Sequence, residues 1–375
     1  MKEEQPDDPS ITGSAPLGFH DRNNDTRKHS DYLTSLQAFR GIAALGVVVY
    51  HAGLFTERQA KQVLFGGAWH LGELGVDFFF VLSGFIIAFV HGGELGKPEH
   101  APRYIRRRFF RVYPLLAIVT TLKLALELVA WLRGGAATDI SRITASYLLL
   151  PAPDGQMPVV TAAWTLTHEM LFYALFLLAM LLGRRAAVWI FGIWMALVAI
   201  ISGAGVSLQG MPRLIFDAHN VEFICGVWAC YAFRRANQGQ TPLLHTGIAS
   251  LATLAAGAWL YNPEGGMEQT LLVRLLLGIG FAKLILLAGL WERSKQGTPW
   301  PKWSLTLGDA SYSIYLGHSL ILLVGVEAGR RFLPPAPWSA YVAAGLSCAA
   351  ALFFCSLLWT WVERPLLRWS RQWCR

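Results

Sequence analysis

The apolar residues of this sequence come in runs of about 20, the length that an α-helix needs to cross a hydrocarbon core about 30 Å thick. Within these runs they do not alternate with polar residues, as they would in a half-buried strand. Only 15% of the 375 residues are charged, against about a quarter in soluble proteins. We therefore predict an all-α, polytopic membrane protein with about ten transmembrane helices. The predicted spans are 36–56, 74–91, 112–133, 165–182, 187–206, 219–235, 244–261, 271–291, 307–327 and 339–362.

The spans leave little of the chain for anything else. Residues 1–30 are polar and charged and lack the apolar core of a signal peptide, so we expect a disordered cytoplasmic tail there. Residues 31–366 form the predicted transmembrane domain, and 367–375 a short cytoplasmic tail. Because no soluble catalytic domain is expected, any chemistry must be carried out by side chains of the membrane helices.

The formal net charge of +8 reflects topology rather than nucleic-acid binding. If the N-terminus is cytoplasmic, the cytoplasmic segments hold about three times as many Lys and Arg residues as the outer loops. This bias predicts a multi-pass protein of the inner (plasma) membrane with both termini in the cytoplasm. We expect no nucleic-acid partner.

A dense basic segment, RYIRRRFFRVYP at 103–114, precedes the third span on the predicted cytoplasmic side. Its Arg108 and Arg111 are three residues apart and share one helical face, and Arg40 enters the membrane from the same side. These arginines fit two interpretations. They are anchors that contact lipid headgroups, or they form a clamp that binds phosphate through guanidinium groups.

Titratable side chains gather in the outer half of the predicted bilayer. His51 lies in the stretch FRGIAALGVVVYH, on the same helical face as Arg40 and about 16 Å from it. The other members are Asp77, His168, Glu169, Asp217, His219, Asn220, Glu222 and His318. Each has an ordinary explanation, such as a carboxylate at a helix start. Imidazole beside carboxylate is also the arrangement that makes a general base, so the cluster as a whole predicts a catalytic site.

The sequence offers no metal signature. The stretch HEMLF at 168–172 resembles the H-E-x-x-H start of zinc proteases but has Phe172 in place of the second histidine. The five cysteines show no C-x-x-C spacing. We therefore predict no metal site.

Six motifs, in this order, resemble the integral-membrane acyltransferase 3 family over nearly the whole chain, from about residue 36 to 366. They are Arg40-x10-His51, GVDFFFVLSGF at 75–85, RRFFRVYP at 107–114, WTLTHEMLFY at 164–173, DASYSIYLGH at 309–318 and VERP at 362–365. The resemblance implies a ten-helix acyltransferase domain. It also implies transfer of an acyl group, commonly acetyl, from cytoplasmic acyl-coenzyme A to a hydroxyl at or beyond the outer face. The chain is most similar to the exopolysaccharide-acetylating members.

The resemblance implies roles for the matching residues. Arg40, Arg108 and Arg111 would hold the phosphates of acyl-coenzyme A, and its pantetheine arm would run towards His51. His51 would take the proton from the acceptor hydroxyl, or would itself be acylated first; the sequence leaves both routes open.

Other predicted site residues surround His51. Glu169 is the preferred carboxylate to orient it, with Asp77 or Glu222 as alternatives, and His318 is a second catalytic imidazole. The acceptor, a glycan or lipid-linked saccharide, would contact the predicted substrate-binding residues Trp164, His168, Glu222 and Tyr315.

The chain departs from the family pattern at two positions. Gln37 stands where many members have an acid before the first arginine, and His168 stands where the sugar-acetylating members often have an aromatic residue. Two other functions remain open from the sequence. They are a transporter with a buried His/carboxylate relay, and a non-catalytic subunit of a polysaccharide export complex.

Overall fold

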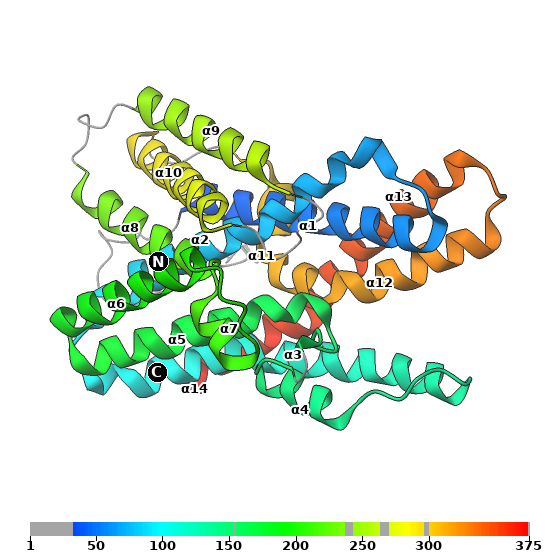
Figure 1. Ribbon diagram of the computed structural model, residues 1–375, viewed down its shortest axis with the longest axis horizontal. Coiled ribbons are helices and arrows are strands. Elements are labelled where there is room, and N and C mark those ends of the chain that lie inside the picture. Colours follow the sequence, from blue (N-terminus) through cyan, green and yellow to red (C-terminus); the bar gives the residue numbers. More distant parts are fainter. Residues whose placement is uncertain (1–32, 153–154, 237–242, 263–269, 296–299, 374–375) are drawn as a thin grey trace, which may run out of the picture.

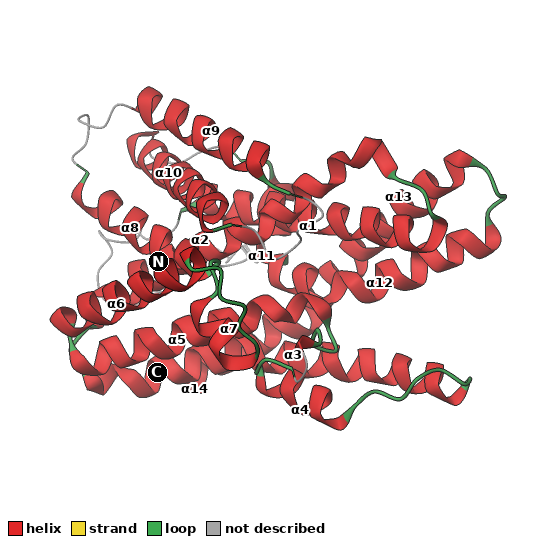
Figure 2. Cartoon of the chain, viewed as in Figure 1, coloured by secondary structure: helices red, strands yellow, loops and turns green. Residues whose placement is uncertain are grey.

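The computed structural model describes residues 33–152, 155–236, 243–262, 270–295 and 300–373. Throughout these ranges the chain consists of helices and loops and has no strand (Figure 2). Nine helical segments of the described chain are long and apolar enough to cross a membrane. The prediction of an all-α, polytopic membrane protein is confirmed. The tail expected at 1–30 lies outside the described residues.

The helices that correspond to the predicted spans are α1 (Thr34–Ala60), α2 (Leu74–His91), α3 (Ala101–Leu132), α5 (Trp164–Leu182), α6 (Arg184–Gly203), α8 (Asn220–Arg235), α9 (Leu243–Leu260), α10 (Leu271–Lys295), α12 (Ser311–Phe332) and α13 (Pro337–Leu358). Shorter elements connect them: a 3₁₀ segment (Leu64–Glu73), α4 (Ile140–Leu148), α7 (Gly210–Phe216), α11 (Lys302–Asp309) and α14 (Arg364–Trp373). We expected a short tail from residue 367, but this segment is helical and belongs to α14 as far as Trp373.

The predicted span 219–235 corresponds to a helix at almost the same residues, but this helix is not among the nine segments long enough to cross a membrane. It is α8, a helix of 16 residues, shorter than the about 20 that cross a bilayer. Its start is fixed by Asn220, whose side-chain amide donates to the carbonyls of Leu214 at 2.8 Å and Ile215 at 3.1 Å. These bonds turn the chain from α7 directly into α8, which places the first turn of α8 within the protein.

Helix α1 lies centrally in the molecule (Figure 1). It contacts α2, α10, α11, α12, α13 and the 3₁₀ segment. Helices α12 and α13 pair at one end, while α8, α9 and α10 lie with α2 at the other. Because α1 contacts so many elements, its side chains can meet residues from distant parts of the chain.

Helices α2 and α8 cross in direct backbone contact. A Cβ atom on Gly84 would lie 1.9 Å from the carbonyl oxygen of Phe223, and one on Gly226 would lie 1.9 Å from that of Val81. Glycine is therefore required at both positions for this crossing. The close approach brings the first turn of α8 beside the middle of α2.

Candidate active site

His51 of α1 and His318 of α12 face each other across the helix interface. Nε2 of His318 lies 3.2 Å from Nδ1 of His51, and the two ring centroids are 4.8 Å apart. Each Nδ1 also lies near the backbone carbonyl one turn earlier, that of Val47 at 3.0 Å and that of Ile314 at 2.9 Å. A carbonyl oxygen only accepts, so these contacts place the hydrogen on Nδ1 in both rings.

This tautomer assignment gives the two imidazoles different roles. Nε2 of neutral His318 carries a lone pair and accepts from Nδ1–H of His51, a hydrogen that the Val47 carbonyl shares. Neutral His51 then has its own lone pair on Nε2, which is the form of imidazole that can take a proton. His318 is completely buried and His51 only half-buried, so His51 is the member of the pair that a substrate can reach.

Glu169, the carboxylate that we predicted to orient His51, contacts other residues instead. Its Oε1 accepts hydrogen bonds from the Ser83 hydroxyl at 2.7 Å and from the Tyr173 hydroxyl. Two hydroxyl donors satisfy this carboxylate locally, and α5 holds it against α2. In the described chain its hydrogen bonds do not reach His51. This corrects the prediction, because His318 and a backbone carbonyl occupy the position expected for a carboxylate.

Asp77 and Glu222, the alternative partners of His51, are engaged by Arg274 of α10. The Arg274 guanidinium donates to Oδ1 of Asp77, and its Nη1 lies 3.9 Å from Oε1 of Glu222. All three side chains are at most 2% exposed. Breaking such a pair would leave an uncompensated buried charge, so the contact fixes α2, α8 and α10 relative to one another. The sequence had revealed no partner for Arg274.

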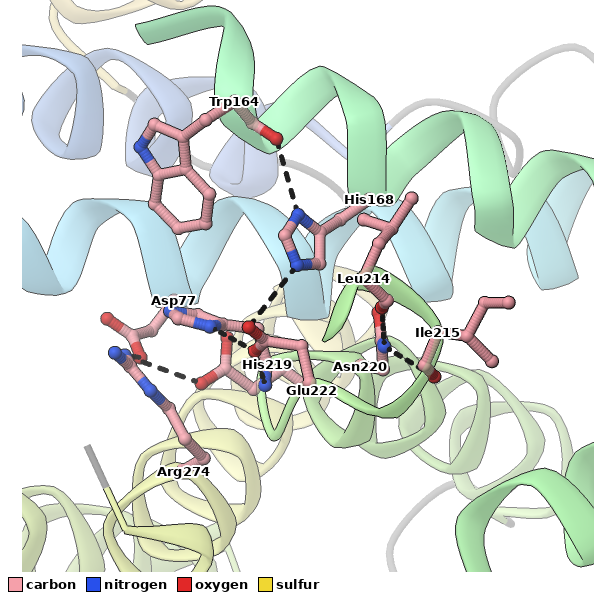
Figure 3. A network of polar contacts seen from close by, with 10 residues as sticks. Asp77, Trp164, His168, Leu214, Ile215, His219, Asn220, Glu222 and Arg274 are labelled. Atoms are coloured by element: carbon pink, nitrogen blue, oxygen red, sulfur yellow. Dashed lines mark hydrogen bonds and ion pairs between the residues drawn. The ribbon is translucent and has the colours of Figure 1, made fainter. Parts of the chain in front are cut away.

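A second imidazole–carboxylate cluster lies beside this ion pair (Figure 3). Asp217, in the connection from α7 to α8, has Oδ1 2.6 Å from Nδ1 of His219 and Oδ2 3.7 Å from Nε2 of His168. The indole ring of Trp164 packs against both imidazoles, with centroid distances of 5.4 Å and 5.1 Å. Burial raises the pKa of the Asp217 carboxyl, but the adjacent imidazoles outweigh burial and hold that pKa well below its usual range. Asp217 is therefore an anion held between two histidines.

Tyr315 links the two groups of histidines. Its hydroxyl lies 2.9 Å from Oγ1 of Thr165, in the first turn of α5 one turn before His168. Its ring centroid is 6.3 Å from that of His318. The predicted substrate-binding residues therefore divide: Tyr315 lies near His318, while Trp164, His168 and Glu222 lie around Asp217.

Arg108, Arg111 and Arg40, the arginines of the predicted phosphate clamp, all contact polar side chains of the protein. Nη2 of Arg108 lies 3.0 Å from Nε2 of His91, whose Nδ1 lies 2.6 Å from Glu94. The Arg108 guanidinium also lies over the rings of Tyr104 and Tyr173, at 5.7 Å and 5.3 Å. This contact pattern orients the arginine in a way that a simple surface anchor does not need.

Arg111 and Arg40 are oriented by acceptors from distant motifs. Arg111 donates to Glu363, the acid of the VERP motif, whose other oxygen accepts from Ser313 at 2.6 Å. Arg40 donates to Oε1 of Gln37 at 3.1 Å, and Nε2 of Gln37 donates to Asp309 at 2.6 Å. Gln37 therefore connects Arg40 to a carboxylate from another part of the chain.

Residues 33–360 match the family model described as an acyltransferase domain, Acyl_transf_3. The chain belongs to the acyltransferase 3 family. It is 30% identical over 326 residues to "Exopolysaccharide production protein ExoZ" of Rhizobium meliloti (strain 1021), which covers 82% of this chain and 93% of that protein. It is 27% identical over 378 residues to "Acyltransferase MdmB" of Streptomyces mycarofaciens, which covers 90% and 92%. No solved structure matches the chain at a significant level. The protein is therefore a membrane acyltransferase.

Sequence reasoning missed several partners within this site. His91, Ser83 and Tyr173 lie inside or beside the quoted motifs but carried no signal of their own. Glu363 lay in a recognised motif, yet nothing in the sequence showed that it faces Arg111. Asp217 and His219 were placed in the titratable cluster, but nothing in the sequence showed that they contact each other and His168.

Proposed function

We propose that this acyltransferase moves an acyl group, acetyl in the simplest case, from acyl-coenzyme A to a hydroxyl of a glycan. His51 is its general base. The observation that supports this proposal most is the His51–His318 contact. It keeps Nδ1 of His51 protonated and leaves Nε2 of a half-buried imidazole free to accept a proton. A serine hydrolase holds its histidine by the same principle, with a carboxylate as the acceptor.

In the proposed reaction, Nε2 of His51 removes the proton from the acceptor hydroxyl as the oxygen attacks the thioester carbonyl. A carbon–oxygen bond forms, the carbon–sulfur bond breaks, and the thiolate of coenzyme A leaves and takes a proton. Alternatively, Nε2 attacks first and the acyl group passes from His51 to the hydroxyl. Both routes need the same unprotonated nitrogen.

The donor would bind along α1. Arg40 lies 11 positions before His51 on one continuous helix, a rise of about 16 Å. Arg40, Arg108 and Arg111 would contact the phosphates, and the pantetheine arm would bridge the distance to His51. The orientation of Arg108 by His91 and of Arg111 by Glu363 favours a built phosphate site over lipid anchoring.

The acceptor class rests on the relatives. One relative is called an exopolysaccharide production protein, so we propose a polysaccharide or lipid-linked saccharide as the acceptor. We place the protein in the inner membrane with both termini in the cytoplasm, which puts His51 in the outer half.

The decisive experiment measures release of free coenzyme A thiol from acetyl-coenzyme A by purified, detergent-solubilised protein, with and without isolated surface glycan. Wild-type protein should release thiol and label the glycan, and His51→Gln should lose both while still binding coenzyme A. His245→Gln, at an exposed position on α9, is the matched control. Wild-type protein that binds but never cleaves acyl-coenzyme A would favour a transporter or an export subunit instead.

A further inference from the structure

The cluster of His168, Asp217 and His219 is not used by the proposed acyl transfer. It gathers two imidazoles and one carboxylate from the second turn of α5 and the connection into α8 (Figure 3). One ligand-type atom from each of the three residues lies within 4.8 Å of the others. The sequence predicted no metal site, but from this geometry we propose that the three side chains form a binding site for a divalent transition metal, Zn²⁺ first among them.

The donor set fits zinc. Two histidine nitrogens and one carboxylate oxygen, with a fourth position open, are the ligands of a known class of zinc sites. Ligand atoms about 2.1 Å from a tetrahedral ion lie roughly 3.4 Å apart. The Nε2–Oδ2 distance between His168 and Asp217 is 3.7 Å. This pair is already close to the spacing of two zinc ligands, while Nδ1 of His219, 2.6 Å from Oδ1 of Asp217, would exchange its hydrogen bond for a bond to the ion.

The state of His168 is an independent observation. Its side chain is more than nine-tenths buried, and its Nε2 is fully buried with no hydrogen-bond partner. Its Nδ1 lies 3.3 Å from the carbonyl of Trp164. Metal-binding histidines typically donate their other ring N–H to such a carbonyl, which aims a lone pair at the ion. Nε2 faces Oδ2 of Asp217 at 3.7 Å, beyond hydrogen-bonding distance, and the ion would lie between these two atoms.

The surrounding charges and acceptors also favour a cation. Asp77, Asp217 and Glu222 place three carboxylates close together, with Arg274 as the neighbouring guanidinium. Buried acceptor atoms around the cluster that make no hydrogen bond include Asp77 Oδ2, both carboxylate oxygens of Glu222 and Asn220 Oδ1. Buried acceptors without a donor call for an ion or water. The aromatic rings of Phe80 and Trp164 pack against the two imidazoles.

A bound ion would join elements that are otherwise held by side-chain packing. His168 belongs to α5, while Asp217 and His219 fix the turn from α7 into α8. Zinc would therefore stabilise the α5–α8 contact, and this consequence does not depend on the identity of the acyl donor or acceptor.

The test uses full-length protein purified without a histidine tag, stripped with chelator and dialysed against metal-free buffer. We expect one Zn²⁺ per chain by elemental analysis after reloading, and a higher melting temperature with zinc than without it. Co²⁺ should produce the visible absorption of a tetrahedral site. Mg²⁺ should have no effect, because it prefers oxygen ligands.

Two variants and one control separate this site from surface binding. His168→Phe and Asp217→Asn should each weaken zinc binding by at least about tenfold, and His245→Ala should bind as wild type. Gel filtration and circular dichroism of the zinc-free proteins establish that the variants are folded. Wild-type protein that retains no zinc and shows no tetrahedral Co²⁺ spectrum would overturn the site. Equal zinc affinity in wild type and Asp217→Asn would overturn it as well.

Discussion

The tautomer arrangement of the His51–His318 pair predicts that the two histidines contribute very unequally to catalysis. His51 carries the accepting nitrogen, so His51→Gln removes the base, and loss of a general base costs roughly 10²–10⁴-fold in rate. His318 acts through His51, because it accepts the Nδ1–H at 3.2 Å and is itself completely buried. Its substitution should therefore cost much less.

The expected loss of rate in His318→Gln follows from the hydrogen bonds that the substitution removes and retains. The substitution removes one hydrogen bond between neutral groups, which contributes about 0.5–1.5 kcal/mol. If that energy serves only to hold the productive tautomer, the rate falls by roughly 2- to 13-fold. The carbonyl of Val47, 3.0 Å from Nδ1 of His51, still favours the same tautomer. We therefore expect kcat to fall modestly and the KM for acetyl-coenzyme A to stay constant.

The assay is steady-state release of coenzyme A thiol by wild type, His51→Gln, His318→Gln and the exposed control His245→Gln. Gel filtration and coenzyme A binding establish that each protein is folded. A hundredfold or greater loss in well-folded His318→Gln would refute the assignment and make His318 the base. Near-normal turnover in His51→Gln would remove His51 from the mechanism altogether.

Three further predictions test the rest of the structure. Arg108→Ala should raise the KM for acyl-coenzyme A by about tenfold or more, since a charge-assisted hydrogen bond contributes about 1.5–3 kcal/mol. Because lysine lacks the planar guanidinium fork, a normal KM in Arg108→Lys would instead favour a membrane anchor. Gly84→Val should lower the yield of folded protein, because its Cβ would meet a backbone carbonyl of α8. Gly192→Ala, at a position with open space around it, should not lower the yield. Equal yields would show that α2 and α8 can separate. In a cysteine-free background, an impermeant maleimide should label Ala137→Cys from outside intact cells and Glu99→Cys only after lysis, and the reverse pattern would invert the topology and move His51 to the inner half.

Local composition accounts for the helices and for the residues that each helix carries. An apolar run of sufficient length must form its backbone hydrogen bonds internally, so membrane helices follow from local composition. The shared face of Arg40 and His51 follows from helical periodicity alone, and the structure has both on the single helix α1. The family motifs are also short and local, so they can be recognised in a single sequence.

Which polar side chains meet depends on how the helices pack. His51 and His318 are 267 positions apart, and Asp77 and Arg274 are 197 apart. Such pairings depend on how far one helix is rotated and shifted relative to its neighbour. Close contacts between helices, such as Gly84 against Phe223, fix this arrangement, and the periodicity of a single helix does not encode it. For this reason the sequence placed Glu169 beside His51 when its hydrogen bonds go to Ser83 and Tyr173. For the same reason it did not show that His168 faces Asp217, since these two residues come from separate elements that packing brings together.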